Sequence, residues 1–283
     1  MSRGAVGVVG LGQIGGGVAA ALCRAGWEVA GCDVRAPAAP LPVGLRLVAT
    51  PADVAMWAPT VLVAVLDDAQ VRDVLEGDGG LLGAARAPAT IIVLSTVAVR
   101  TLESAANAAA PAGAAIVDCG VSGGAAAAAE GRLVAMVGGS ADAVRAARPV
   151  IESFAQRVIH AGALGAGMRL KLARNLVTYG SWLVVDEASR LVAASGIATD
   201  ALVEAIRASD PMTGGATALV SGDPARRPAP PALAAIAHKD LRAALELGAE
   251  SGVPMPAGEL ADRFIDDVVR RTAADAPTMR EER

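Results

Sequence analysis

Two side chains that could act together on a substrate, Lys171 and Asn175, stand four residues apart in the C-terminal half of the chain. Residues four apart on a helix share one face, so an ammonium group and a carboxamide would point the same way from an otherwise apolar helix. Such a pair is natural for a substrate site. The alternative is a solvated lysine near a helix start with a polar neighbour, because most lysines are exposed. The pair alone favours that alternative, and the remaining motifs reverse the preference.

A glycine-rich turn near the N-terminus predicts a dinucleotide site. The segment Gly10–Gly15 reads Gly-Leu-Gly-Gln-Ile-Gly and follows Ala5–Val9, an apolar run typical of a buried strand. In this motif the glycines allow a tight turn, the approach of a pyrophosphate and close packing of the following helix, whose N-terminus faces the phosphates. A second predicted strand, Glu28–Cys32, ends at Asp33, which can accept hydrogen bonds from a ribose diol. The expected cofactor contacts here are Gly10, Leu11, Gly12, Gln13, Ile14, Gly15 and Asp33.

Polar residues and glycines follow other predicted strands. Ser122, Gly123 and Gly124 come after the predicted strand Ala114–Val117, and their hydroxyl and amides could cradle a carboxylate. Open α/β sheets place ligands at the carboxyl ends of their strands, but taken alone the segment fits a flexible glycine turn equally well. Thr96 stands at the same predicted edge and could contact the bound dinucleotide, although many strands end in Ser or Thr for turn reasons.

Two further residues complete the predicted cofactor contacts. Leu66 ends the predicted strand Thr60–Leu66, and Lys239, next to Asp240, opens a helical run from which it could reach the cofactor. The alternative for Lys239 is a solvated charge pair at a helix start.

Composition excludes several classes of function. The net charge is −4 and no basic block is paired with aromatic residues, so we expect no nucleic-acid partner. No apolar stretch reaches about 18 residues without glycine or charge, and no secretory leader precedes the first strand, so we expect no membrane span. Cys23, Cys32 and Cys119 lack metal spacing, and His160 and His238 are far apart. We therefore expect no metal site and a reducing, cytoplasmic location.

Strand-like and helical stretches alternate up to residue 160 and then give way to helices alone. This pattern predicts a mostly parallel sheet covered on both faces, at residues 1–162, followed by an all-helical domain at residues 163–283. The long stretch Met168–Ala194 is apolar on most sides and predicts a central helix that joins the domains. Further strands are expected at 90–94, 133–137 and 157–159, and further helices at 69–75, 100–110, 141–154, 198–209, 231–251 and 258–272.

In order and spacing these motifs resemble the β-hydroxyacid dehydrogenase family, typified by 3-hydroxyisobutyrate dehydrogenase. The residues that carry the resemblance are Gly10–Gly15, Leu94–Val97, Asp118–Gly124, Gly165–Gly167 with Lys171 and Asn175, Lys239–Leu241 and Ser251–Pro256. The resemblance implies a Rossmann domain, a helical domain of the 6-phosphogluconate dehydrogenase-like kind, an active site in the cleft between them, and a homodimer or homotetramer formed through the helical domain. One departure is Cys119-Gly120, where the family usually has Ala-Pro.

The expected activity is the NAD(P)-dependent interconversion of a small anionic β-hydroxy acid and its semialdehyde. Lys171 would be the general acid and base, Asn175 would hold the substrate oxygens, and Ser122 with the amides of Gly123 and Gly124 would bind the carboxylate. Because Asp33 would repel a 2′-phosphate, we expect NAD as the cofactor, with NADP as the alternative.

Other designs of dehydrogenase fit the sequence less well. The short-chain class needs Tyr-x-x-x-Lys, but Tyr179 has Leu183 at that offset, and neither histidine lies in a lactate-type motif. An imine reductase-type NADPH enzyme shares the expected architecture but commonly has Asp or Tyr in place of Lys171. A catalytically idle NAD-binding dimer is the alternative from another class, and the presence of both Lys171 and Asn175 disfavours it.

Overall fold

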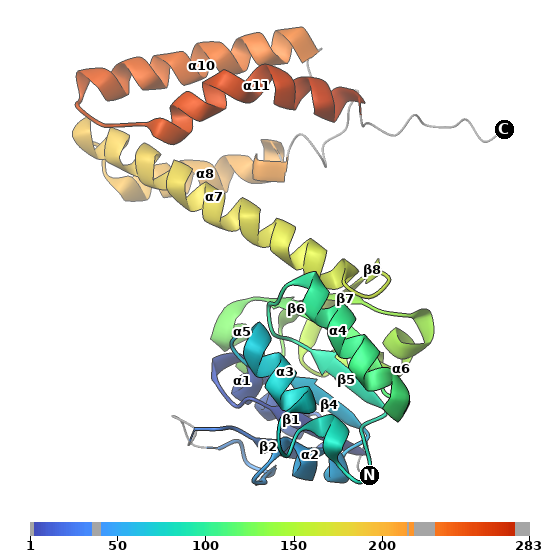
Figure 1. Cartoon of the computed structure of the whole chain (residues 1–283). Coiled ribbons are helices and arrows are strands. Elements are labelled where there is room, and N and C mark those ends of the chain that lie inside the picture. The colour runs from blue at the N-terminus through green and yellow to red at the C-terminus, as the bar shows by residue number, and fades with distance from the viewer. Residues whose placement is uncertain (1–2, 36–40, 214, 218–229, 275–283) are drawn as a thin grey trace, which may run out of the picture. The chain divides into compact units, whose positions relative to one another are not determined.

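The computed structural model describes residues 3–35, 41–213, 215–217 and 230–274 of the 283-residue chain (Figure 1). The chain divides into two compact units, Met1–Arg174 and Asn175–Arg283. The first holds the strands and the second is helical, as the sequence predicted, while the predicted division at residues 162 and 163 stays a prediction.

An eight-stranded sheet forms the centre of the first unit, in the order β3-β2-β1-β4-β5-β6-β7-β8. All neighbouring strands are parallel except β6 and β7, which are antiparallel. The strands are β1 (Ala5–Val9), β2 (Glu28–Cys32), β3 (Leu45–Leu47), β4 (Thr60–Val63), β5 (Thr90–Val93), β6 (Ala115–Ser122), β7 (Leu133–Gly138) and β8 (Ala155–Gly162). The carboxyl ends of the parallel strands β1, β4 and β5 therefore lie side by side at one edge.

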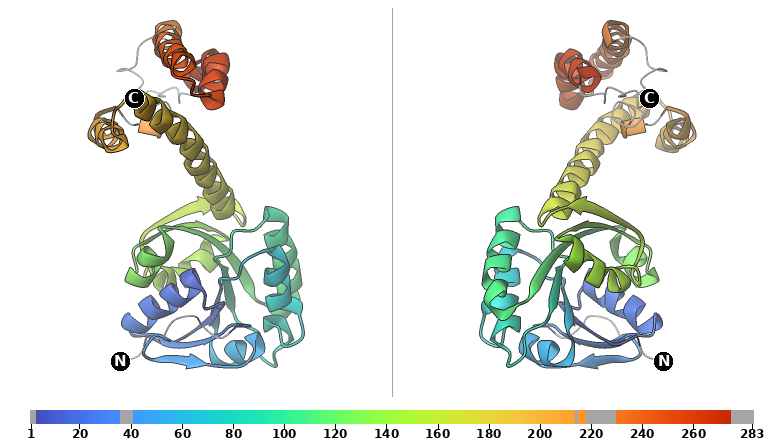
Figure 2. Two further views of the ribbon diagram at one scale, coloured as in Figure 1. Left: turned by 90° about the vertical axis from the view of Figure 1, so that its left-hand side faces the viewer. Right: turned by 90° about the vertical axis from the view of Figure 1, so that its right-hand side faces the viewer.

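Helices cover both faces of this sheet, and strand residues alternate between two apolar layers. Val8 and Leu62 face the layer that contains α1 (Gln13–Arg24), α5 (Gly124–Glu130) and α6 (Ala141–Ile151). Val9 and Val63 face the layer of α2 (Pro51–Trp57), α3 (Asp68–Glu76) and α4 (Val99–Ala109). Figure 2 shows the sheet between the blue α1 and the teal α3 and α4. The 3-10 turns η1 (Leu81–Gly83) and η2 (Ala110–Ala112) complete this unit.

The predicted long helix is present as α7 (Ala166–Ala194), which begins in the first unit and continues into the second. The second unit adds α8 (Thr199–Thr213), η3 (Gly215–Thr217), α10 (Pro230–Glu250) and α11 (Pro256–Ala274). Glu187 of α7 is 2% exposed and accepts hydrogen bonds from the backbone N–H groups of Ala257 (2.7 Å) and Gly258 (3.0 Å). A buried carboxylate thus caps the start of α11.

Four features of the first unit differ from the sequence prediction. The short edge strand β3 and the helix α2 were not predicted; β3 has only three residues, of which Arg46 and Leu47 are exposed and Leu45 is half-buried, and so carries little apolar signal. The alanine-rich run 124–130 forms the helix α5. The strand β6 continues to Ser122, five residues beyond its predicted end at Val117. None of the helices in the described ranges carries an apolar stretch sufficient to traverse a bilayer.

Candidate active site

The Gly10–Gly15 turn has the geometry that its glycines predict. Gly10 has a φ of +90°, and a Cβ there would lie 2.4 Å from the carbonyl oxygen of Ala64. A Cβ on Gly15 would lie 1.8 Å from the carbonyl oxygen of Gly10, so α1 packs directly against the turn. Gly12 instead has no atom within 4 Å of its Cβ position, and no side chain caps α1. The open side of the turn therefore presents uncapped helix N–H groups, which suits a pyrophosphate.

Asp33 lies beside this turn, as predicted. One carboxylate oxygen accepts a hydrogen bond from the N–H of Leu11 (2.7 Å) and the other from the N–H of Arg35 (3.0 Å). These bonds fix the carboxylate at the end of β2, next to the fingerprint. Gln13 and Ile14 form the first turn of α1, so the whole set of predicted cofactor residues from Gly10 to Asp33 comes together. Their arrangement fits a dinucleotide with a free ribose diol.

Leu66 and Thr96 follow the adjacent strands β4 and β5 and are both exposed, Leu66 to 78%. Hydrogen bonds to side chains hold the two loops that carry them in place. The hydroxyl of Ser95 accepts a hydrogen bond from the N–H of Val65 (2.9 Å), and Asp68 accepts one from the N–H of Ala98 (2.9 Å) and another from the Thr101 hydroxyl. The Thr101 hydrogen bond is the main cause of a lowered pKa at Asp68. Both predicted contacts thus project from fixed loops at the strand edge where ligands bind in such sheets.

Lys171 lies against β6. Only 8% of it is exposed, and a Cβ on Gly120 would be 2.5 Å from its Cβ and 2.9 Å from its Cγ. The stem of the lysine therefore occupies the space that any other residue would fill at position 120. Burial, and then the nearby charge of Arg174, lower the pKa of Lys171. A buried amine of lowered pKa is what a proton-transferring lysine needs.

Ser122 shares a face of β6 with Gly120, because side chains alternate along a strand. Two residues of strand span about 7 Å, which is within reach of a lysine side chain. The following glycines have φ values of +135° and +75° at Gly123 and Gly124, and Gly124 opens α5. No side chain caps α5, which leaves its first amides without a side-chain partner, and the binding of an anion by these amides and the Ser122 hydroxyl stays a prediction. The first unit thus brings the predicted anion cradle near Lys171.

Two predicted site residues belong to the second unit. Asn175 stands on α7, four residues after Lys171. Lys239 stands on α10 with its side chain 76% exposed, and its Nζ lies 3.2 Å from a carboxylate oxygen of Asp240. Their roles stay predictions.

The sequence analysis missed Asp118 and Gly120 as functional candidates. Asp118 is 0% exposed and binds the start of α7, and Gly120 makes room for Lys171. The only signal was the departure at Cys119-Gly120, where the loss of a ring allows this close contact.

His238 joins two helices of the second unit. Its ring nitrogens lie 2.5 Å from an oxygen of Asp262 and 3.0 Å from an oxygen of Asp266, so the imidazole of α10 bridges two carboxylates of α11. Hydrogen bonds that the ring donates to Asp262, and then to Asp266, raise the pKa of His238 above its usual value of 6.5.

The stability of the second unit should therefore depend on pH. A histidine whose folded pKa is raised stabilises fully below about pH 6.5 and loses that contribution as pH rises through the raised value. We expect the melting temperature to fall over this window and the fall to be smaller in His238→Gln. Thermal unfolding followed by circular dichroism from pH 5 to 9 measures both, and an equal slope in the variant would assign the dependence to other groups.

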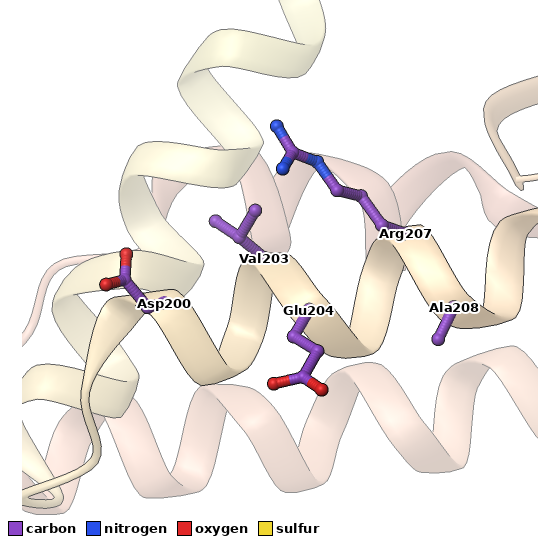
Figure 3. Close-up of a pocket in the computed structure, with 5 residues that line it drawn as sticks. All are labelled: Asp200, Val203, Glu204, Arg207 and Ala208. Carbon is purple, nitrogen blue, oxygen red and sulfur yellow. The ribbon is translucent and has the colours of Figure 1, made fainter.

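Other described features do not add to the site. A pocket on α8 is lined by Asp200, Val203, Glu204, Arg207 and Ala208, all from one helix (Figure 3), and it includes none of the predicted site residues. Among the described residues, no cluster of three or more His, Cys, Asp or Glu could hold a metal ion. The three cysteines are free thiols.

Comparison with known proteins places this geometry in a family. Residues 5–162 match the NAD binding domain of 6-phosphogluconate dehydrogenase, and residues 165–279 match the NAD-binding domain of NADP-dependent 3-hydroxyisobutyrate dehydrogenase. The chain is 39% identical over 267 residues to an uncharacterized oxidoreductase of Mycobacterium tuberculosis, with 90% of each chain covered. It is 30% identical over 262 residues to the 3-sulfolactaldehyde reductase of Escherichia coli, covering 90% of this chain and 86% of the reductase.

A solved structure agrees with these relatives. The 3-hydroxyisobutyrate dehydrogenase of Mycobacterium tuberculosis, solved with L-serine, has a TM-score of 0.64 and 29% identity, covering 97% of this chain and 95% of that one. Both halves of the sequence and the order of its motifs therefore point to one conclusion: the chain belongs to the β-hydroxyacid dehydrogenase family and is an NAD(P)-dependent oxidoreductase.

Proposed function

We propose that the enzyme interconverts a small β-hydroxy acid and its semialdehyde, with Lys171 as the general acid and base. The observation that carries this proposal is the placement of Lys171, whose buried stem lies over Gly120 on the face of β6 that also bears Ser122. A hydroxy acid needs one group that transfers the hydroxyl proton and another that binds the carboxylate. The lysine stem and the predicted anion-binding turn both lie at this face of the strand.

The chemistry divides between the cofactor and the protein. The nicotinamide, when bound, accepts or returns the hydride. In oxidation the neutral amine of Lys171 takes the proton of the substrate hydroxyl as the hydride leaves, and in reduction the ammonium returns that proton to the carbonyl oxygen. Because burial lowers the pKa of Lys171, its neutral form is more accessible than that of an exposed lysine.

The anionic end of the substrate would bind at the start of α5. Ser122 would donate its hydroxyl hydrogen bond, and the amides of Gly123 and Gly124 would add backbone donors next to the positive end of the helix. Asn175, a residue of α7, would bind further oxygens of the substrate. Two relatives support a small substrate with an anionic group, since one is named a 3-sulfolactaldehyde reductase and another was solved with L-serine.

Two other functions compete with this proposal. An imine reductase would not need a buried lysine on α7 packed against β6, and Lys171 therefore favours alcohol and carbonyl chemistry. A catalytically idle dimer would have no reason to keep the amine buried beside an anion-binding turn.

The helical unit supports a homodimer or homotetramer. Leu176, Tyr179, Trp182 and Leu183 of α7 are between 52% and 75% exposed in the single chain, which is costly for apolar side chains in water. We propose that a second copy covers them. The three free thiols support our placement of the enzyme in the reducing cytoplasm.

A spectrophotometric screen tests the proposed activity. L-serine, 3-hydroxyisobutyrate and a sulfonate analogue would be offered with NAD from pH 7 to 10, and NADH formation would be followed at 340 nm. Cyclic imines would be offered with NADPH in parallel, and NADPH consumption would be followed at the same wavelength. We expect turnover of an anionic β-hydroxy acid that increases toward alkaline pH. Activity confined to imines, or to substrates without an anionic group, would contradict the proposal.

We expect NAD to be preferred over NADP. The Asp33 carboxylate is fixed beside the turn by Leu11 and Arg35, where it would repel a 2′-phosphate. Because a like-charge contact costs several kcal/mol, kcat/KM should favour NAD by roughly tenfold or more. Asp33→Asn is the matched variant, since an amide oxygen can still accept the hydrogen bond from the Leu11 N–H. This variant should reduce the kcat/KM preference for NAD over NADP. A wild-type ratio that favours NADP would overturn the assignment.

A further inference from the structure

The first turn of α7 is tied to the sheet by a buried carboxylate. Asp118 of β6 is 0% exposed, and its two oxygens accept hydrogen bonds from the backbone N–H groups of Gly165 and Met168, each at 2.6 Å. These are the residue before the helix and the third residue inside it, whose N–H groups have no partner within a helix. With both oxygens engaged, the start of α7 cannot move without breaking a buried charge-assisted hydrogen bond.

Two glycines, Gly138 and Gly167, allow the start of α7 to pack closely against the sheet. A Cβ on Gly138 of β7 would lie 2.3 Å from an oxygen of Asp118 and 2.8 Å from the N of Gly167. A Cβ on Gly167 would lie 2.4 Å from the carbonyl oxygen of Met136 and 2.7 Å from the N of Gly138. The backbone of α7 therefore packs directly on the backbone of β7, and no side chain is present that could adjust to a displaced helix.

Lys171, the proposed proton-transferring residue, lies close to this anchored first turn of α7. Lys171 comes three residues after Met168, and its Cβ lies over Gly120, two residues along β6 from Asp118. Asp118, Gly120 and Ser122 share one face of the strand, so a single strand face anchors the helix, receives the lysine stem and presents the anion cradle. An error of about 1 Å in the position of a reacting group can cost roughly a hundredfold in rate.

We infer that Asp118 is a positioning residue that sets the location of the Lys171 amine through the first turn of α7. This inference rests on the proposed function, in which Lys171 transfers the proton. Burial raises the pKa of the Asp118 carboxyl, and the hydrogen bonds from Gly165 and Met168 and the charge of Arg169 oppose that rise. The carboxylate form provides the acceptors that both N–H groups require.

Asp118→Asn is the test variant, because it keeps the shape of the side chain but can accept only one of the two hydrogen bonds. Glu187→Gln is its matched control, since Glu187 is also buried and caps a helix start through two backbone N–H groups, at α11. We expect both variants to lower the melting temperature. Only Asp118→Asn should lower kcat, by roughly tenfold to a hundredfold, with the NADH Kd within about twofold of wild type.

A second measurement reports on the amine without turnover. Lys171 and Lys239 are the two lysines of the chain, so reductive methylation with ¹³C-formaldehyde gives two lysine signals by NMR, and Lys239→Arg assigns them. In the wild type the Lys171 signal should titrate below the usual pKa of a lysine, because burial lowers the pKa of this amine. In Asp118→Asn its midpoint should move upward as the amine gains water, and in Glu187→Gln it should stay in place.

These outcomes separate the two proposals. If Asp118→Asn loses stability but keeps the wild-type kcat and the wild-type midpoint of Lys171, Asp118 is structural only and the positioning role is wrong. If Lys171→Ala itself retains turnover, the proposed function fails instead, whatever Asp118→Asn does.

Discussion

Replacing Lys171 by alanine should reduce turnover by roughly 10²–10⁴-fold, because a positioned acid and base contributes about that much to a proton transfer. NADH affinity should stay near wild type, since the lysine stem lies on Gly120 and not on the Gly10–Gly15 turn. Stopped-flow absorbance gives the rate of hydride transfer, and NADH fluorescence titration gives the affinity.

Lys171→Arg is the control for charge. It keeps a cation on α7 but cannot release a proton at neutral pH, so it should be as inactive as the alanine variant. If either Lys171→Ala or Lys171→Arg kept a near-wild-type kcat, Lys171 would have no role in proton transfer.

Replacing Gly12 by alanine should separate cofactor binding from folding. Its Cβ would meet no protein atom within 4 Å, so the melting temperature should hardly change. The same methyl group would occupy the space in which a pyrophosphate approaches the uncapped start of α1. Losing a favourable contact of an anion with a helix N-terminus costs up to about 2 kcal/mol, which corresponds to roughly thirtyfold in the NADH Kd.

Alanine variants of two other glycines are the controls for Gly12→Ala. Gly83 also has open space at its Cβ position, and Gly83→Ala should keep both stability and affinity. Gly15→Ala would place its Cβ 1.8 Å from the Gly10 carbonyl oxygen and should destabilise the protein even without cofactor. Calorimetry and NADH titration of the three variants give the comparison. Unchanged NADH affinity in Gly12→Ala would mean that the phosphates bind elsewhere.

The sequence was most informative where a local pattern has one physical solution. Apolar runs such as Ala5–Val9 and Thr90–Val93 are strands because both faces of a parallel sheet are buried, and the Gly10–Gly15 spacing has meaning only between a strand and a helix. The β6 extension was missed because Gly120, Gly123 and Gly124 resemble a turn, whereas Gly120 is a glycine on account of Lys171, 51 residues later.

The role of Asp118 was hidden for the same reason. Its hydrogen-bond partners Gly165 and Met168 lie 47 and 50 residues away, beyond any local pattern. Sequence motifs predicted candidate ligand contacts, and the fold was needed to find Asp118, which anchors the start of the helix that carries Lys171.

The alternation along β6 also constrains how this enzyme can change in evolution. Asp118, Gly120 and Ser122 share a face only because each lies two residues from the next. A single inserted or deleted codon between Asp118 and Ser122 would turn one of them to the opposite face, into the apolar layer that contains Cys119. Insertions and deletions should therefore not accumulate in this strand. Differences in length should be confined to the turns on either side of it.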